Sequence, residues 1–466
     1  MNPDEVEIPE VGVVVLRFHD DDLDTGDRAH LLGDGTVGHE RRDRHGRAVS
    51  GEPLRDLGGD DLRPAVRIEV GLRHEDPAAV EFTHGYTVSA RRAPRSIAIA
   101  TSRYSVVVSL PLPTRPHNNF DAVRIAAALA VIVGHSFELV GIEPIPRVLN
   151  VPLHSIGVFV FFAMSGYLIS SSWLRRPVLG DYLRNRTLRI MPGLIVVTVA
   201  SFAVLGPVMS SLSVADYLEN PRSWRYLLNI VLRPVFDLPG VFEDNPYAGS
   251  VNGSLWTLPI EFVCYLVFPL LLALGRARVF ALVAFIVGAV LVERLVADPL
   301  VFWGSSFQRA ANLAVFFALG SLVAVAGRRL RLRLDVAVVL LAFQAVFSAM
   351  ASPATTQWTL WPVLTYSVLA FCTHSTPVIR RAARFGDLSY GLYIYAFPVQ
   401  QVVVAVLPPL GFVGNLVVVT LTTTVLAWLS WHLVEKHALR LKATSNRSRA
   451  TAVAAAPADG VAPTPR

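Results

Sequence analysis

The stretch "FDAVRIAAALAVIVGHS" (residues 120–136) decides the fold class, because it is an apolar run of membrane character that carries two polar residues. Arg124 stands near its start and His135 near its end, and both side chains are costly in hydrocarbon. Apolar blocks of roughly 18 to 25 residues, the length that crosses a hydrocarbon core about 30 Å thick, recur along the rest of the chain. The sequence therefore predicts an all-α, polytopic membrane protein.

The composition agrees with a membrane protein and excludes several other classes. The chain has 466 residues, of which 53% are hydrophobic and 17% charged, whereas soluble proteins average about 25% charged residues. Cys264 and Cys372 both fall inside apolar runs, which supports neither a disulfide framework nor a metal site. The positive charge is almost all arginine and stands where the positive-inside rule places it. We therefore expect no metal and no nucleic-acid partner.

Residues 1–116 differ in composition from the rest of the chain. They hold charged runs such as "HDDDLDTGD" (19–27) and "HERRDRHGR" (39–47), and no apolar stretch long enough to span. The first residues are acidic and lack the apolar core of a signal peptide. Two short pieces, "GVVVLRF" (12–18) and "AVRIEVGL" (65–72), alternate as strands do. We expect a polar extension that is disordered or partly structured, or a stretch upstream of a later, non-AUG start codon.

From residue 120 onward the sequence predicts about ten membrane spans, within a membrane domain over residues 117–440. The predicted spans are 120–140, 154–174, 190–209, 254–274, 279–297, 309–326, 334–350, 358–375, 387–408 and 412–433. Arginine or lysine follows every even-numbered span, so both termini are expected in the cytoplasm. The piece "RYLLNIVLRPVF" (225–236) is too short to span and predicts a re-entrant or interfacial helix. Residues 441–466 predict a disordered cytoplasmic tail.

Arg124 and His135 lie on one face of the first predicted span. They are eleven residues apart, which is about 16 Å along a helix, and eleven steps of about 100° return almost to the starting azimuth. Alone, Arg124 can be a snorkelling interface residue and His135 a helix-packing residue. Together they form a polar track in which the arginine can hold an anionic cofactor and the histidine can act as a base. Glu138 either orients the imidazole or sits at the outer interface.

Five stretches in order carry a resemblance to a known family. The first is the arginine, ten intervening residues and histidine of the first span. The others are "GVFVFFAMSGYLIS" (157–170), "YLRNRTLRIMPGL" (182–194), "NGSLWTLPIEFVCYLVFP" (252–269) and "GDLSYGLYIYAFPV" (386–399). Over roughly residues 117–440 the chain resembles acyltransferase family 3, the integral-membrane O-acyltransferases that modify sugars. Two positions depart from the family pattern: the usual Asp-Gly-Leu-Arg start reads Asp-Ala-Val-Arg, and Ala396 replaces a frequent histidine.

The resemblance implies a co-substrate and residues that bind it. The co-substrate would be acyl-CoA, most often acetyl-CoA in this family, and it would enter from the cytoplasm. Its phosphates would be held by the first-span arginine and by the basic run that leads into the third span. The expected cofactor-binding residues are Arg124, Arg184, Arg186 and Arg189.

Further polar residues stand in the family blocks. Glu261 lies in the fourth span, where a carboxylate faces a cavity or a partner charge. On straight helices Arg124 would be too distant, so His135 or a substrate hydroxyl is the expected partner of Glu261. Ser165 precedes a glycine and suits either close helix packing or oxyanion donation. Trp256 is expected near Glu261. Tyr390 and Tyr393 share a helix face, which favours packing or an interfacial belt over catalysis.

The sequence therefore predicts a membrane-bound O-acyltransferase that moves an acyl group from acyl-CoA to a sugar hydroxyl. The sugar would belong to a cell-surface glycan, a glycolipid or a glycosylated metabolite. His135 is the expected general base and Glu261 a second catalytic residue, and the expected partners are acyl-CoA, the acceptor and membrane lipid. Direct transfer and a relay through an acylated enzyme group both remain open. The alternatives are a transporter or flippase for a glycan or lipid-linked sugar, and a catalytically idle protein of the same fold.

Overall fold

The computed structural model describes seven short strands between residues 15 and 108, and then residues 118–296, 300–376 and 387–441. By its internal contacts the chain divides into two units, Met1–His117 and Asn118–Arg466. The expected tail, 441–466, lies outside the described residues apart from Leu441. The two units are described separately.

The first unit contains two small sheets. One has the strand order β1-β6-β7, with β1 parallel to β6, and the other has the order β3-β2-β5-β4. β1 and β4 fall inside the two alternating pieces at 12–18 and 65–72. The strands are β1 (Val15–Arg17), β2 (Arg28–Leu31), β3 (Val37–Glu40), β4 (Val66–Leu72), β5 (Phe82–Val88), β6 (Ile97–Ala100) and β7 (Ser105–Val108).

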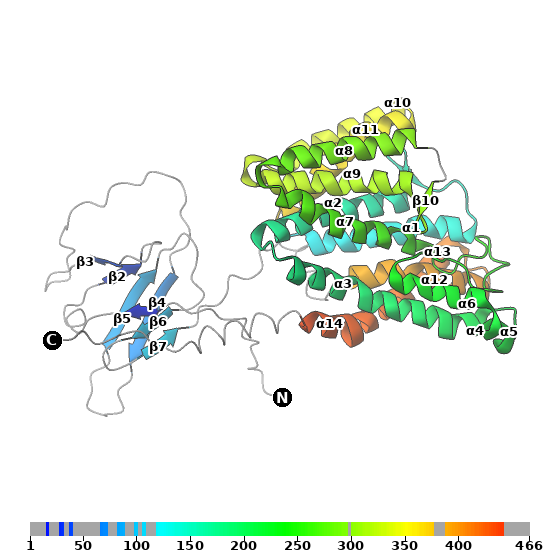
Figure 1. Ribbon diagram of the computed structural model, residues 1–466, viewed down its shortest axis with the longest axis horizontal. Helices are drawn as coiled ribbons and strands as arrows, with labels where there is room; N and C mark the ends of the chain where they lie inside the picture. The colour runs from blue at the N-terminus through cyan, green and yellow to red at the C-terminus, as the bar shows by residue number, and fades with distance from the viewer. Residues whose placement is uncertain are drawn as a thin grey trace. The chain divides into compact units, whose positions relative to one another are not determined.

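The second unit is a bundle of long helices (Figure 1). The helices, with short 3₁₀ or π segments named η, are α1 (Phe120–Val140), α2 (Leu153–Arg175), α3 (Leu179–Ala200), η2 (Ser201–Leu205), α4 (Gly206–Met209), α5 (Val214–Glu219), α6 (Pro221–Arg225), η3 (Tyr226–Val231), η4 (Gly253–Trp256), α7 (Thr257–Ala273), η5 (Gly275–Ala277), α8 (Arg278–Leu295), α9 (Phe307–Ala326), η6 (Gly327–Arg329), α10 (Leu334–Met350), α11 (Pro353–Thr373), α12 (Leu388–Val406), α13 (Gly411–Ser430), η8 (Trp431–Glu435) and α14 (Lys436–Arg440). Two hairpins, β8–β9 (Arg147–Val148 with Val151–Pro152) and β10–β11 (Val301–Phe302 with Ser305–Ser306), join helices.

Eight helical stretches among the described residues are long and apolar enough to cross a membrane. The prediction of an all-α, multi-pass membrane protein is therefore confirmed. The other two predicted spans correspond to α10, a shorter apolar helix of 17 residues, and α11. These two helices pack against each other at one side of the bundle (Figure 1).

The piece at 225–236 does not cross the bundle. It forms the end of α6 and the six-residue 3₁₀ helix η3, after which the chain turns at Leu232 with a positive φ of 59°. η3 packs against α3, and Tyr226 is fully buried in a small core with Tyr217 and Val241. The segment is thus a short 3₁₀ helix packed against α3 and not a longer regular helix, and its re-entrant or interfacial placement stays a prediction.

α2 lies at the centre of the bundle and contacts α1, α7, α9 and α11. Its closest approach is to α9, where a Cβ added to Gly166 would overlap the carbonyl oxygen of Phe317. The facing Gly320 of α9 is pressed in the same way against the carbonyl oxygen of Ala163. Small residues at both positions let the two backbones meet, as is common between membrane helices.

The third span begins earlier than predicted. α3 starts at Leu179 and not near residue 190, so the arginines at 184, 186 and 189 lie on a helix and not in a basic loop. Arg186 and Arg189 are three residues apart and share a helix face, whereas Arg184 is displaced from it. This periodicity decides which of the arginines reach the interior.

Candidate active site

α1 carries its arginine and its histidine into two different cavities. Arg124 lines a narrow cavity of about 70 Å³, here called the arginine chamber, together with Ser165, Arg186, Arg189, Glu261 and Tyr390. His135 lines a wider cavity of about 700 Å³, here called the histidine chamber, together with Glu138, His154, Tyr247, Trp256 and Arg309. The predicted polar track along α1 is therefore divided into two compartments.

The two chambers meet at Val158 and Tyr393, which line both of them. The Tyr393 hydroxyl lies 2.7 Å from Thr257 Oγ1 and donates a hydrogen bond to the Ser254 carbonyl oxygen at 3.0 Å. These contacts hold the ring of Tyr393 in place. Val158 and Tyr393 are thus the lining residues that the two chambers have in common, and two substrates held in the two chambers would approach each other near them.

Two arginines of the arginine chamber belong to an ion-pair cluster centred on Asp387, the residue before α12. Its Oδ2 lies 2.6 Å from Arg189 Nη2 and 3.7 Å from Arg124 Nη1, and Asp121 lies 3.5 Å from the same Arg124 nitrogen. Burial raises the pKa of Asp387, but the guanidinium groups of Arg189 and Arg124 hold that pKa well below its usual range. Asp387 is therefore a fixed negative charge between the two arginines.

Arg186 has no such partner. Among the described residues its guanidinium makes no ion pair or hydrogen bond, and its Nε is buried; its Cζ lies 5.9 Å from the ring centroid of Tyr265. An unpaired cation in a protein interior is costly. Arg186 therefore has N–H donors that an anionic ligand in the chamber could accept from.

Glu261 lies in the arginine chamber and not beside His135. Of its two predicted partners, His135 is therefore wrong and a substrate hydroxyl stays a prediction. Its Oε1 accepts hydrogen bonds from Ser165 Oγ at 3.0 Å and from Tyr265 Oη. The prediction assumed straight spans that start level with one another. Instead the packing of α7 against α2 and α3 brings Glu261 into the same cavity as the arginines.

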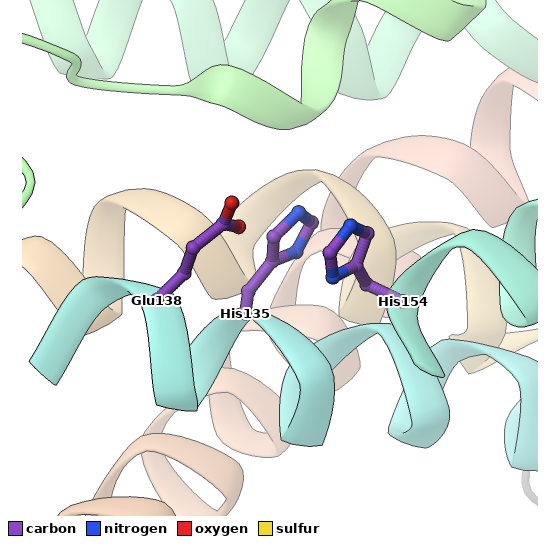
Figure 2. A group of neighbouring side chains, drawn as sticks. All are labelled: His135, Glu138 and His154. Atoms are coloured by element: carbon purple, nitrogen blue, oxygen red, sulfur yellow. The ribbon is translucent and has the colours of Figure 1, made fainter. Parts of the chain in front are cut away.

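The histidine chamber brings together three groups from two helices. The rings of His135 (α1) and His154 (α2) are nearly parallel, at 7°, with centroids 4.8 Å apart, and Phe397 contacts His135 edge-on at 5.5 Å. Figure 2 shows His135 between Glu138 and His154. Glu138 therefore lies beside the imidazole of His135, which is one of its two predicted positions; the other was the outer interface.

These three side chains are also a potential metal-ligand set, although the sequence predicted no metal. One ligand atom from each of them can be chosen so that all lie within 4.8 Å of one another. In a tetrahedral zinc site, ligand atoms lie roughly 3.3 Å apart, as follows from metal–ligand bonds of about 2.0 Å. The set is wider than such a site and would have to contract around an ion, so we derive no catalytic step through a metal.

Gly134 sets the distance between the two histidines. A Cβ at this position would overlap the backbone nitrogen of His154 and lie 2.8 Å from its Cβ. We expect Gly134→Ala to push α1 and α2 apart, to lower the detergent melting temperature and to reduce activity at least tenfold, because overpacking costs about 1–3 kcal/mol and displaces the paired rings. Gly180→Ala, at a position where a Cβ meets nothing within 4 Å, is the control. Wild-type activity in Gly134→Ala would show that this contact does not position the histidines.

The remaining predicted residues divide between the chambers and the surface. Tyr390 lines the arginine chamber and donates a hydrogen bond to the Ile190 carbonyl at 2.6 Å. Trp256 faces the histidine chamber and not Glu261, and Arg309 Cζ lies 5.3 Å from its ring centroid. Arg184 is exposed, and its Nη2 donates to the Leu441 carbonyl at 2.9 Å. The structure does not place Arg184 in either chamber.

Three residues of the site were missed by the sequence analysis. His154 and Arg309 are the first residues of two predicted spans, and Asp387 stands inside the quoted motif at 386–399, where no role was assigned to it. For His154 there was a signal, because the second span starts on the membrane side where the first span ends. A histidine at the start of the second span should therefore lie near the level of one close to the end of the first.

The sequence of this chain matches a protein family and several known proteins. The family model described as "Acyltransferase domain" matches residues 117–432. The chain is 32% identical over 332 residues to "O-acetyl transferase" of Shigella phage Sf6, covering 69% of this chain and 96% of the relative. It is 29% identical over 377 residues to "Nodulation protein 10" of Rhizobium leguminosarum bv. viciae, covering 72% and 97%.

A third relative is more distant. It is "Putative peptidoglycan O-acetyltransferase YrhL" of Bacillus subtilis (strain 168), 26% identical over 336 residues, covering 60% of this chain and 50% of the relative. No solved structure matches the chain significantly.

Proposed function

This chain belongs to acyltransferase family 3 and is a multi-pass membrane acyltransferase, and from that premise we propose that it transfers an acetyl group from acetyl-CoA to a sugar hydroxyl. The acceptor would be part of a cell-surface glycan, a glycolipid or a glycosylated metabolite. Two relatives are named as O-acetyltransferases, one of them for peptidoglycan. The observation that carries the proposal is the pair of adjoining chambers, one with an unpaired arginine and one with a histidine pair.

The arginine chamber is the proposed donor site. Arg124, Arg186 and Arg189 offer charge-assisted hydrogen bonds to the anionic groups of acetyl-CoA. The chamber of about 70 Å³ is too small for the donor as it stands. Donor binding therefore requires the Asp387 contacts to rearrange, with phosphate taking over part of the role of that carboxylate.

We place this donor site on the cytoplasmic side of the membrane, with both termini of the chain in the cytoplasm. A fluorescent protein fused to the C-terminus should then fluoresce.

The histidine chamber is the proposed acceptor site. His135 removes the proton from a sugar hydroxyl as the hydroxyl oxygen attacks the thioester carbonyl carbon near Tyr393. The C–S bond then breaks, the ester forms, and the coenzyme leaves as a thiolate that takes up the proton from the imidazolium. A thiolate is a good leaving group, so positioning and one base can suffice. A relay through an acylated enzyme group is the alternative, and a burst of acyl-enzyme would identify it.

Glu261 is the proposed second catalytic residue, and it acts on the donor side. Its carboxylate is oriented by Ser165 and Tyr265 and faces the chamber of the three arginines. We expect Glu261→Gln to lower kcat on the order of 100-fold, with a smaller effect on the KM of the acceptor. Steady-state kinetics with both substrates would measure this. Glu219→Gln, on the exposed helix α5, is the control; equal kinetics in the two variants would remove Glu261 from the mechanism.

The test of the proposed function is acetyl-CoA-dependent acylation by purified wild-type protein. Radiolabelled acetyl-CoA is mixed with the protein and with sugar acceptors of increasing size, and free coenzyme A and labelled product are both followed. A transporter or flippase, or an idle protein of this fold, would release no coenzyme A. That outcome would overturn the proposal.

A further inference from the structure

A deep apolar groove opens on the bundle between α7, α8 and α9. It has a volume of about 740 Å³, and its described lining is almost entirely hydrocarbon. Residues of all three helices line it, among them Val263, Phe285, Gly288, Val292, Ala311 and Ala314. Val263 is half exposed, and a Cβ added at Gly288 would meet no atom within 4 Å. The groove is therefore open at this side of the bundle and is not filled by any described side chain.

The groove adjoins the histidine chamber and not the arginine chamber. Ser305, in the β10–β11 hairpin, lines both the groove and the histidine chamber, and its hydroxyl donates to the Trp256 carbonyl at 3.1 Å. The described linings of the groove and the arginine chamber share no residue. On α7, Ile260 and Val263 face the groove while Glu261 faces the arginines. An apolar chain in the groove would thus be joined to whatever occupies the histidine chamber.

A cation marks the junction between the two cavities. Arg309 is exposed within the histidine chamber, and its guanidinium lies over the Trp256 ring at 5.3 Å. Among the described residues this guanidinium makes no ion pair and no hydrogen bond. Its neighbours on α9, Phe307 and Ala310, line the groove. A phosphate held by Arg309 would therefore have hydrocarbon on one side and the histidine pair on the other.

We propose that the acceptor reaches the enzyme as a sugar joined through phosphate to a long hydrocarbon chain. The chain lies in the groove between α7, α8 and α9, the phosphate binds Arg309, and the sugar enters the histidine chamber. This inference rests on the proposed function, because it assigns the acceptor side of the same reaction. The acyl chain of a donor is a poorer occupant, since the groove shares no described residue with the donor chamber. Van der Waals contact between the chain and the groove supplies affinity, and the charge of Arg309 selects phosphate.

The test is lipid binding to the full-length, detergent-purified protein, measured by native mass spectrometry. The probes are a polyprenyl phosphate, the matching polyprenol and phosphatidylglycerol. We expect the polyprenyl phosphate to bind at least tenfold more tightly than the other two. A Cβ at Gly288 meets no atom within 4 Å, so Gly288→Phe places a ring in the groove, and it should weaken binding of the polyprenyl phosphate at least tenfold. Arg309→Leu should remove the preference for phosphate over the alcohol, and Arg309→Lys should retain part of it.

The matched control is Leu291→Phe, which adds a ring to the exposed surface of α8 outside the groove lining. Equal binding by Gly288→Phe and Leu291→Phe would overturn the inference. Equal binding of phosphatidylglycerol and polyprenyl phosphate to the wild type would also overturn it, because the groove would then hold ordinary bilayer lipid. The two proposals fail separately. If the wild-type protein binds polyprenyl phosphate as expected but consumes no acetyl-CoA, only the proposed acetyltransferase activity is refuted. If the protein transfers acetyl groups but Gly288→Phe leaves binding of polyprenyl phosphate unchanged, only the lipid-linked acceptor is refuted.

Discussion

His135→Ala is expected to lower kcat for acetyl transfer by about 10²- to 10⁴-fold, the range typical for loss of a positioned general base. Binding of acetyl-CoA should change little, because His135 lies in the histidine chamber and the three arginines lie in the other. The measurement is transfer from radiolabelled acetyl-CoA at saturating donor, together with donor binding by calorimetry. A fall in kcat with unchanged donor affinity would separate a catalytic role from a structural one.

The control for this variant is His374→Ala. His374 is an exposed histidine at the end of α11 and lines neither chamber. Each protein is first checked for a single detergent size-exclusion peak. Transfer by His135→Ala at the rate of the control would remove the base assignment and leave Glu261 as the candidate. Loss of donor binding as well as turnover would show that the stacked histidines support the bundle rather than the chemistry.

Arg124→Ala is expected to raise the KM for acetyl-CoA by at least 10-fold, because a charge-assisted hydrogen bond is worth about 1.5–3 kcal/mol. It should also destabilise the protein, since Asp387 would keep only Arg189 as its cation. Arg124 and Asp387 retain 18% and 17% side-chain exposure, so solvent reduces the cost below that of a fully buried pair. The KM and the melting temperature in detergent are the two measurements.

The double variant Arg124→Ala/Asp387→Asn separates binding from folding. Removing both charges should reverse much of the fall in melting temperature seen in Arg124→Ala, because the Asp387 carboxylate that lost a cation is no longer present. The KM for acetyl-CoA should remain high, because the donor still lacks one guanidinium. Arg222→Ala, which breaks an exposed ion pair with Asp237, is the control for general loss of arginine. Recovery of both properties in the double variant would reduce Arg124 to a structural partner of Asp387.

The ion-pair cluster also predicts a dependence of stability on pH. The pKa of Asp387 is lowered in the folded protein, so its contribution to stability is fully present above the usual pKa of an aspartate. That contribution is lost as the pH falls toward the lowered value. Melting temperatures of the wild type and of Asp387→Asn should therefore converge in acid.

The sequence alone determined the membrane class, the helical fold and the family. These follow from local properties: the length of each apolar block, the placement of arginines in loops, and the short family motifs. The predicted axial separation of Arg124 and His135 holds in the structure, because both residues belong to the single continuous helix α1. A count of residues along one helix gives their axial separation directly.

Tertiary structure alone decided which residues share a cavity. Glu261 shares a cavity with the arginines because α7 packs against α2 and α3, and Arg186 lines that cavity while Arg184 does not. His154, Asp387 and Arg309 come from α2, the start of α12 and α9, which meet α1 or α7 only after folding. The depth and rotation of one helix against another depend on packing contacts such as those of Gly134 and Gly166. Hydrophobic periodicity within a single segment carries no information about them.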